Sequence, residues 1–140
     1  MKFIIAKNQV EIFTVIYIRK LVFMDEQNVS VDEELDCLDF EADHFLLEVD
    51  NEHVATARVY YEADKATIGR VAVLIRHRKK GYAKFLMEET INYIRNKEAS
   101  TIHIGAQVQA LGFYEKLGFE VIGDIYLDAN IEHYPMELKL

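Results

Sequence analysis

The chain has 140 residues, of which 51% are hydrophobic and 29% charged, and it carries a formal net charge of -8. That length and balance predict one domain over residues 1–140, while the negative charge argues against nucleic acid as a partner. No apolar run approaches the ~20 residues that cross a bilayer, and the single cysteine, Cys37, excludes an intrachain disulfide, so we expect a cytoplasmic protein without a membrane partner.

The first half of the chain predicts a strand, a helix, an acidic loop and then three strands. Between residues 9 and 23 apolar side chains lie almost all round a helix, which predicts a helix buried on several sides. Residues 25–43 carry nine carboxylates and no Lys or Arg, and we interpret them as a loop with one short helix near residues 32–37. Strands, with hairpin turns at 50–52 and 62–65, are expected at residues 2–6, 44–49, 53–61 and 66–75.

The second half predicts alternating helices and strands. Apolar residues recur at three-and-four spacing after Gly81, which predicts a helix over residues 79–97. We then expect a strand at 101–105, a helix at 107–117 that Gly118 ends, and a strand at 119–127. A turn at 128–130 leads to a last strand at 131–140. The element order is that of a mixed α/β fold, with helices packed on a central sheet.

The junction between the strand at 66–75 and the helix at 79–97 carries the most informative residues. The apolar strand ends in a basic run, and nine positions hold five of the sixteen Lys and Arg residues: Arg76, Arg78, Lys79, Lys80 and Lys84. Free amides and the positive end of the helix dipole meet these side chains, which favours a phosphate or pyrophosphate ligand. The alternative is a solvated helix start, which is what an isolated basic run usually indicates.

Three blocks of the sequence resemble the GNAT superfamily of acyl-CoA-dependent N-acetyltransferases. The segment RKKGYA at 78–83 is similar to its Arg/Gln-x-x-Gly-x-Gly/Ala motif, and residues 106–119 are similar to its second conserved block. The pattern R-x-x-V-F-x-x-E-Q at 19–27, with Asp36 and I-x-H-x-x-M at 131–136, resembles the ElaA-like subgroup more narrowly. The resemblance implies a mostly antiparallel sheet of about seven strands and about four helices, with a splayed pair of parallel strands that forms the CoA cleft.

The same resemblance implies roles for particular residues. The splayed strand would bind the pantetheine arm of acetyl-CoA through Val71, Ala72 and Val73. The loop amides would wrap the pyrophosphate at Arg78, Lys79, Lys80, Gly81, Tyr82 and Ala83. The Val73 amide would stabilise the oxyanion of the thioester carbonyl, and Tyr114 would protonate the leaving thiolate. Gln107 would hydrogen-bond the pantetheine, and the 3′-phosphate would bind Arg76, Lys79, Lys80 or Lys84.

The general base that takes a proton from the acceptor amine stays open. Four side chains are candidates: Glu26, His44, His103 and His133. Of these, Glu26 and His133 are expected to line the acceptor pocket. The five histidines show no metal-ligand spacing, so no metal is expected. Direct attack within a ternary complex is favoured over an acyl-enzyme on Cys37, which we expect to be a small, partly buried residue.

Three positions depart from the family pattern. Ile75 stands where a proline commonly ends the splayed strand, Ala83 replaces a glycine, and Gly105 occupies a position that is often polar. The acidic segment 25–43 could attract a cationic amine, but we favour a solvated loop. The predicted function is acetyl-CoA-dependent N-acetylation of a primary amine on a small molecule or peptide; the alternatives are a non-catalytic CoA-binding module and a nucleotide-binding protein. The identity of the amine stays open, as does the existence of a homodimer.

Overall fold

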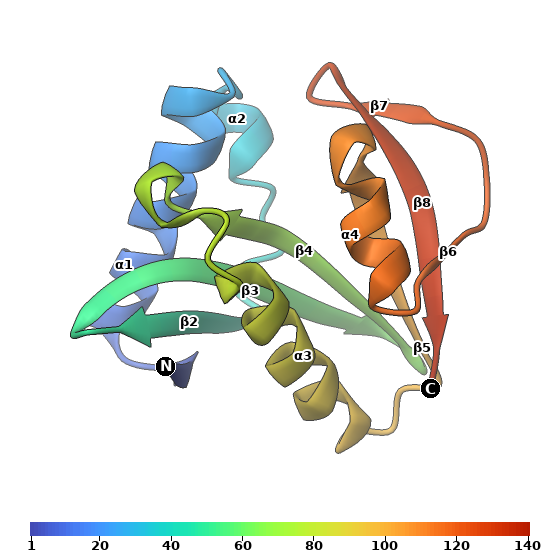
Figure 1. The fold of residues 1–140 in the computed structure, drawn as a ribbon, viewed down its shortest axis with the longest axis horizontal. Helices are drawn as coiled ribbons and strands as arrows, with labels where there is room; N and C mark the ends of the chain where they lie inside the picture. Colours follow the sequence, from blue (N-terminus) through green and yellow to red (C-terminus); the bar gives the residue numbers. More distant parts are fainter.

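The computed structural model describes residues 1–140 and is built on one eight-stranded sheet with helices on both faces (Figure 1). The strands run in the order β1-β2-β3-β4-β5-β8-β6, with β7 paired to β8, and only β4 and β5 are parallel. The strands are β1 (Lys2–Ala6), β2 (Asp43–Val49), β3 (Glu52–Glu62), β4 (Lys65–Val73), β5 (Thr101–Gln107), β6 (Glu120–Val121), β7 (Tyr126–Asp128) and β8 (Ile131–Lys139). The helices are α1 (Gln9–Arg19), α2 (Val31–Glu34), α3 (Tyr82–Arg95) and α4 (Leu111–Lys116). The predicted fold class is confirmed.

Short turns of other helix types complete the chain. A π-helical turn, η1 (Lys20–Glu26), extends α1, while 3₁₀ turns follow β4 at η2 (Ile75–His77) and β5 at η3 (Val108–Ala110). None of the helices is long and apolar enough to cross a membrane.

Two apolar layers sandwich the sheet because side chains alternate between its faces along each strand. Phe45 of β2 points to the layer of α3, where it joins Leu86, and the next residue, Leu46, points to the opposite layer. There it meets Val15 and Ile18 of α1. The short helix α4 shares the α3 layer through Tyr114 and Phe119 at its end, so α3 and α4 stand on the same face of the sheet. Figure 1 shows α1 and α2 behind the sheet and α3 and α4 in front.

Tight hairpin turns fix the register of several strands. Asp50 and Asn51 both adopt positive φ, at 50° and 64°, which is the type I′ geometry of a two-residue hairpin. Ala129 and Asn130 repeat it, at 51° and 61°, between β7 and β8. These two predicted turns are therefore confirmed, as is the one predicted at 62–65, where residues 63 and 64 join β3 to β4. The turn between β7 and β8 also sets Tyr126 of β7 opposite His133 of β8.

A bulge in β4 opens the cleft. Arg58 of β3 lies opposite Gly69, while Thr56 lies opposite Ala72, so β4 has one residue too many in this stretch. Parallel pairing with β5 extends only from Lys65 to Ile68 of β4. Beyond that point β4 continues to Val73 and β5 to Gln107 without pairing to each other, and Figure 1 shows the two strands diverging from a common end.

Several boundaries differ from those predicted. The strand predicted at 66–75 ends at Val73, and the helix predicted between 9 and 23 gives way to the turn η1 after Arg19. The helix predicted at 107–117 begins later, because Gln107 still pairs with His133 as the last residue of β5. The helix predicted at 79–97 begins at Tyr82, after a loop. The continuous strand predicted at 119–127 is wrong: β6 and β7 pair with different parts of β8 and are separated by residues 122–125. The interruption lies opposite Pro135, which lacks the N–H that a regular ladder would need.

Candidate active site

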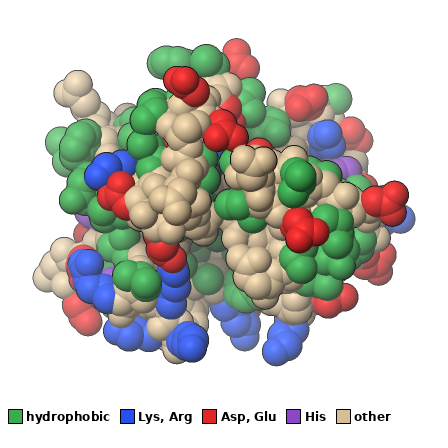
Figure 2. Space-filling view, turned by 90° about the horizontal axis from the view of Figure 1, so that it is seen from above, with side chains coloured by type: hydrophobic (Ala, Val, Ile, Leu, Met, Phe, Trp, Pro, Cys, Tyr) green, Lys and Arg blue, Asp and Glu red, His purple; other side chains and the backbone are tan.

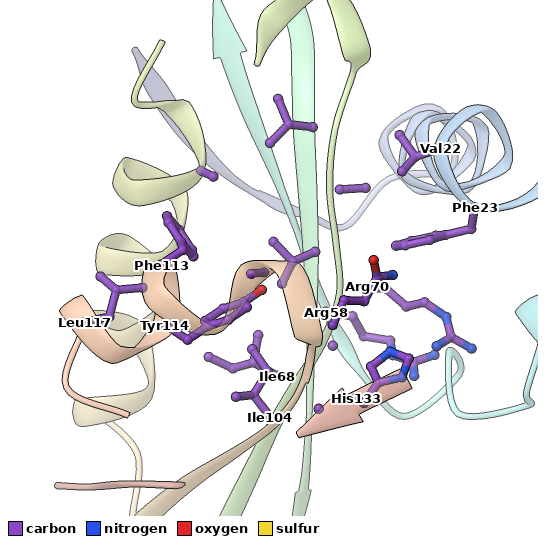
Figure 3. Close-up of a pocket in the computed structure, with 18 of the residues that line it drawn as sticks. Val22, Phe23, Arg58, Ile68, Arg70, Ile104, Phe113, Tyr114, Leu117 and His133 are labelled. Atoms are coloured by element: carbon purple, nitrogen blue, oxygen red, sulfur yellow. The ribbon is translucent and has the colours of Figure 1, made fainter. Parts of the chain in front are cut away.

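A cavity of about 1020 Å³ occupies the gap between the diverging strands β4 and β5. Its walls come from β4, the start of α3, α4, η1 and the β7–β8 hairpin. Figure 3 shows Tyr114 on one wall, Val22 and Phe23 on another, and Arg58, Arg70 and His133 at the far end. The cavity therefore joins segments from nearly the whole chain.

The open edge of β4 presents backbone groups to this cavity. The Leu74 amide donates to the Val54 carbonyl of β3 at 2.9 Å. Successive residues of a strand direct their N–H and C=O groups to opposite sides, so those of Val73 face away from β3 and toward the cleft, whereas those of Ala72 face β3. The Val73 carbonyl accepts from Arg78 Nε at 3.0 Å. All three residues predicted for pantetheine, Val71, Ala72 and Val73, line the cavity.

The loop before α3 has a backbone suited to an anion. Lys79 and Gly81 adopt left-handed conformations, with φ at 63° and 82°. Left-handed residues next to right-handed ones form concave turns that bind anions through their amides. The first helical bond of α3 runs from the Phe85 amide to the Gly81 carbonyl at 3.2 Å, which leaves the amides of Tyr82, Ala83 and Lys84 without a partner inside the helix.

Not every residue of the basic run reaches the cavity. Arg78, Lys79, Gly81, Tyr82, Ala83 and Lys84 line it, whereas Arg76 and Lys80 do not. Arg76 instead pairs with Glu52. Figure 2 looks onto the top of Figure 1 and shows Lys and Arg side chains gathered along one edge of that face. Ile75, which stands where a proline was expected, is 69% exposed at the turn η2.

Glu26 and Arg78 form a bidentate ion pair beside the cavity. Arg78 Nη1 and Nη2 donate to the two Glu26 carboxylate oxygens at 2.5 and 2.6 Å. These hydrogen bonds hold the pKa of Glu26 below its usual range. Because Arg78 also bonds the Val73 carbonyl, one side chain connects η1, the end of β4 and the anion-binding loop. Glu26 itself does not line the cavity.

Tyr114 lies on the α4 wall, and Figure 3 shows its hydroxyl directed into the cavity. Its ring packs edge-on against Phe113 and Phe119, with centroids 5.0 and 6.0 Å away. Burial raises the pKa of Tyr114 to about 12. The phenol is therefore fully protonated at neutral pH and has a proton to donate.

Gln107 lies at the end of β5, where its side chain reaches across the cleft. Its Nε2 donates to Gln27 Oε1, next to η1, at 3.0 Å, and its Oε1 accepts from Gln109 Nε2 at 2.6 Å. Gln107 and Gln27 both line the cavity. These amides connect the two sides of the cleft beyond the point where β4 and β5 part.

Of the four candidate bases, only His133 lines the cavity. Its Nδ1 lies 2.7 Å from the Ile131 carbonyl oxygen. A carbonyl can only accept, so Nδ1 carries the proton and Nε2 offers a lone pair. His44 instead bonds the Asp39 carbonyl at 3.0 Å, and His103 lies 3.1 Å from Glu137.

Cys37, expected to be partly buried, is exposed and does not line the cavity. The prediction of a small, partly buried cysteine is therefore wrong in its burial. No group of three or more His, Cys, Asp or Glu side chains could hold a metal ion.

The lack of a side chain at Gly105 leaves room for Tyr126, a residue that the sequence did not single out. A Cβ at Gly105 would overlap the hydroxyl of Tyr126, which occupies that space. The Tyr126 ring stacks on His133 with centroids 5.6 Å apart, and both residues line the cavity. The position that is often polar in related sequences is thus filled here by a hydroxyl from β7.

A buried ionic cluster at the far end corrects the interpretation of the acidic segment as a solvated loop. Three of its carboxylates turn inward and pair with arginines of α1, β3 and β4. The members of this cluster are Glu34, Asp36, Asp39, Arg19, Arg58 and Arg70. Arg19 is fully buried. Burial raises the pKa of Asp36, but hydrogen bonds from Arg58 outweigh it and bring the pKa to about 2.

Comparison with known proteins agrees with this geometry. The model of the GNAT acetyltransferase domain matches residues 3–140. The uncharacterized N-acetyltransferase YjcF of Bacillus subtilis is 34% identical over 137 residues, 97% of this chain and 98% of its own. The crystal structure of Escherichia coli ElaA superposes with a TM-score of 0.86 at 24% identity, covering 99% of this chain and 97% of its own. A Bacillus subtilis acetyltransferase in complex with CoA gives 0.75 at 16% identity, with coverages of 99% and 98%.

Proposed function

The chain belongs to the GNAT family of acetyltransferases, and on that premise we propose that it transfers an acetyl group from acetyl-CoA to a primary amine by direct attack in a ternary complex. One observation carries the proposal. The free backbone edge at Val73 and the protonated hydroxyl of Tyr114 line one cavity, which begins at an anion-binding loop. Acyl transfer from a thioester needs this combination of oxyanion donor, proton donor and cofactor anchor.

Acetyl-CoA would lie along the open edge of β4. The amides from Arg78 to Ala83 would hold the pyrophosphate, and Gly81 supplies the left-handed conformation that this turn needs. The pantetheine would extend along Val71 to Val73 and accept a hydrogen bond from Gln107. Lys79 and Lys84 are the basic side chains of the run that face the cavity besides Arg78, and they are the ones we assign to the 3′-phosphate.

The chemistry has a simple proton balance. The acceptor enters as an ammonium ion and gives one proton to a base before its nitrogen attacks the thioester carbonyl carbon. The oxyanion that forms accepts from the Val73 amide. When the carbon–sulfur bond breaks, the thiolate takes a proton from Tyr114, which is restored by the second proton leaving the nitrogen. One proton is released overall.

We assign the base to His133 and a positioning role to Glu26. His133 has a free Nε2 and lines the cavity, whereas both Glu26 oxygens are bonded to Arg78. A carboxylate held by an arginine is a weak proton acceptor because its charged form is already stabilised. Glu26 would instead fix the guanidinium that bonds the Val73 carbonyl.

Thiol release from acetyl-CoA across a panel of amines tests the proposal. We expect Tyr114→Phe to lower kcat by roughly 10²-fold, the lower end of the range for general acid catalysis. Tyr93→Phe is the matched control, since this tyrosine is also buried in part but bonds Asp43 away from the cavity. An unchanged kcat in Tyr114→Phe would remove the residue from the mechanism. Calorimetric binding of acetyl-CoA without release on any amine would favour a non-catalytic module.

A further inference from the structure

A second, smaller cavity of about 60 Å³ adjoins the far end of the first. Six residues line both cavities: Phe23, Gln27, Arg70, Gln107, Asp128 and His133. The second cavity also contacts Glu33 and Glu34 of α2 and Ile131 of β8. The space beyond the thioester position therefore reaches between α2 and the β7–β8 hairpin, on the side away from the anion-binding loop.

Most carboxylates of the acidic segment 25–43 near this space already have cationic partners. Glu34, Asp36 and Asp39 are bound to the arginines of the buried cluster. Two others are paired elsewhere, Asp25 with Lys20 and Glu26 with Arg78. Of the acidic residues of this segment that line the two cavities, only Glu33 forms no ion pair; it accepts from Ser30 Oγ.

Arg70 has a donor to spare. Its Nη2 donates to the Glu34 carbonyl at 2.9 Å and to Asp36 Oδ2 at 3.1 Å, and its Nε lies 3.1 Å from Glu34 Oε1. Its other terminal nitrogen, Nη1, forms no hydrogen bond, and the side chain is 20% exposed. Burial and the neighbouring Arg58 both lower the pKa of Arg70. This cation would thus gain from an additional anionic partner.

Arg58 differs in this respect, because both its terminal nitrogens donate to Asp36 and its Nη1 also bonds Asp39. On the opposite side, Asp128 lines both cavities, and its side chain forms no ion pair or hydrogen bond. The space thus has one free cationic donor, on Arg70, and two carboxylates without an ion pair, on Asp128 and Glu33. Together they are complementary to a ligand with both charges, and the two carboxylates would repel a doubly charged phosphate.

Resting on the proposed function, we propose that the acceptor is an amino acid whose carboxylate binds Arg70 Nη1 and whose amine is presented to His133. A guanidinium is suited to this task because its planar donors match a carboxylate. Asp128 would attract the ammonium form before His133 removes its proton. Because the second cavity is small and Arg70 lines it, the carboxylate of an amino acid bound there would lie close to Arg70.

The test compares matched acceptors on the wild-type protein. The twenty free amino acids, their α-amides and their decarboxylated amines are each assayed for thiol release. We expect at least one free amino acid to exceed its amide and its decarboxylated amine in kcat/KM by roughly 10- to 150-fold, the value of a hydrogen bond to a charged group. Arg70→Gln should remove that preference by raising KM for the acid alone. Arg95→Gln, an exposed cation at the end of α3, is the charge control.

The outcomes separate this inference from the proposed function. Amides or decarboxylated amines that react as well as the acids would overturn the inference and leave acetyl transfer standing. If none of the acceptor classes supports thiol release, both the inference and the proposed function are overturned. Arg70 also bonds α2, so the acetyl-CoA affinity and the melting temperature of Arg70→Gln are measured. If that variant does not fold, the comparison of acceptors on the wild type decides alone.

Discussion

Replacing Glu26 by Gln distinguishes two roles of this residue, positioning Arg78 and acting as the general base, because the expected kinetic effects differ strongly in size. If Glu26 positions Arg78, the change weakens one partly exposed ion pair, whose members are 35% and 30% exposed. Such a pair contributes about 1 kcal/mol, which corresponds to roughly a fivefold higher Kd for acetyl-CoA. If Glu26 were the base, kcat would fall by roughly 10²- to 10⁴-fold. We expect the first result.

The assay measures acetyl-CoA binding by calorimetry and kcat by thiol release over a range of pH. Because Arg78 lowers the pKa of Glu26, the carboxylate stays charged well into the acid range, and its loss should leave the acidic limb of the kcat profile unchanged. Asp25→Asn, which removes a comparable exposed pair with Lys20 one residue earlier, is the control. A fall in kcat beyond 10²-fold with unchanged acetyl-CoA affinity and a lost acidic limb would refute the assignment.

Three further experiments test other parts of the protein. Because burial raises the pKa of Tyr114 to about 12, the kcat profile should show no falling limb near pH ~10, where a free tyrosine titrates; such a limb would contradict this environment. Gly105→Ala should lower kcat/KM for the amine by roughly 10²-fold because a Cβ displaces the Tyr126 hydroxyl. Adding Tyr126→Phe should restore part of the lost kcat/KM. No recovery in the double variant would mean that the two residues act independently. Arg19→Met, which removes a fully buried arginine from the ionic cluster, should cost about 3–5 kcal/mol of unfolding free energy. Lys20→Met at an exposed pair should cost under about 1 kcal/mol, and equal losses in chemical denaturation would exclude the cluster as the cause.

The residues that we propose for acetyl-CoA could be named from the sequence because their signals are local. The basic run, Gly81 and the helix that follows lie within a few residues of one another, and Tyr114 belongs to a recognisable block. The residues that we propose for the acceptor could not, since Arg58 and Arg70 meet the acidic segment only after β3 and β4 have folded against α2. A signal was nevertheless available: two arginines stood in apolar strands, while nine carboxylates stood together without a Lys or Arg.

The predicted boundaries of two elements were wrong for a related reason. The sequence predicts Gln107 as the first residue of a helix, yet its pairing with His133 keeps it in β5. Similarly, the apolar residues from 119 to 127 suggest one strand, but their partner β8 contains Pro135. In both cases the deciding contact is with a strand that comes later in the chain.

Arg70 connects the two halves of the site. It belongs to the bulge that interrupts the regular pairing of β4 with β3, and its φ of 49° is a conformation that side-chain-bearing residues rarely adopt. Strain of this kind persists only where surrounding contacts hold it, and here the Arg70 side chain is anchored to Glu34 and Asp36. The bulge therefore lies beside the open edge of β4, where we propose that acetyl-CoA binds, and it contains the residue that we propose for the acceptor carboxylate. On these proposals both binding sites depend on one backbone distortion, and we expect a change at Arg70 to affect them together only when it disturbs α2.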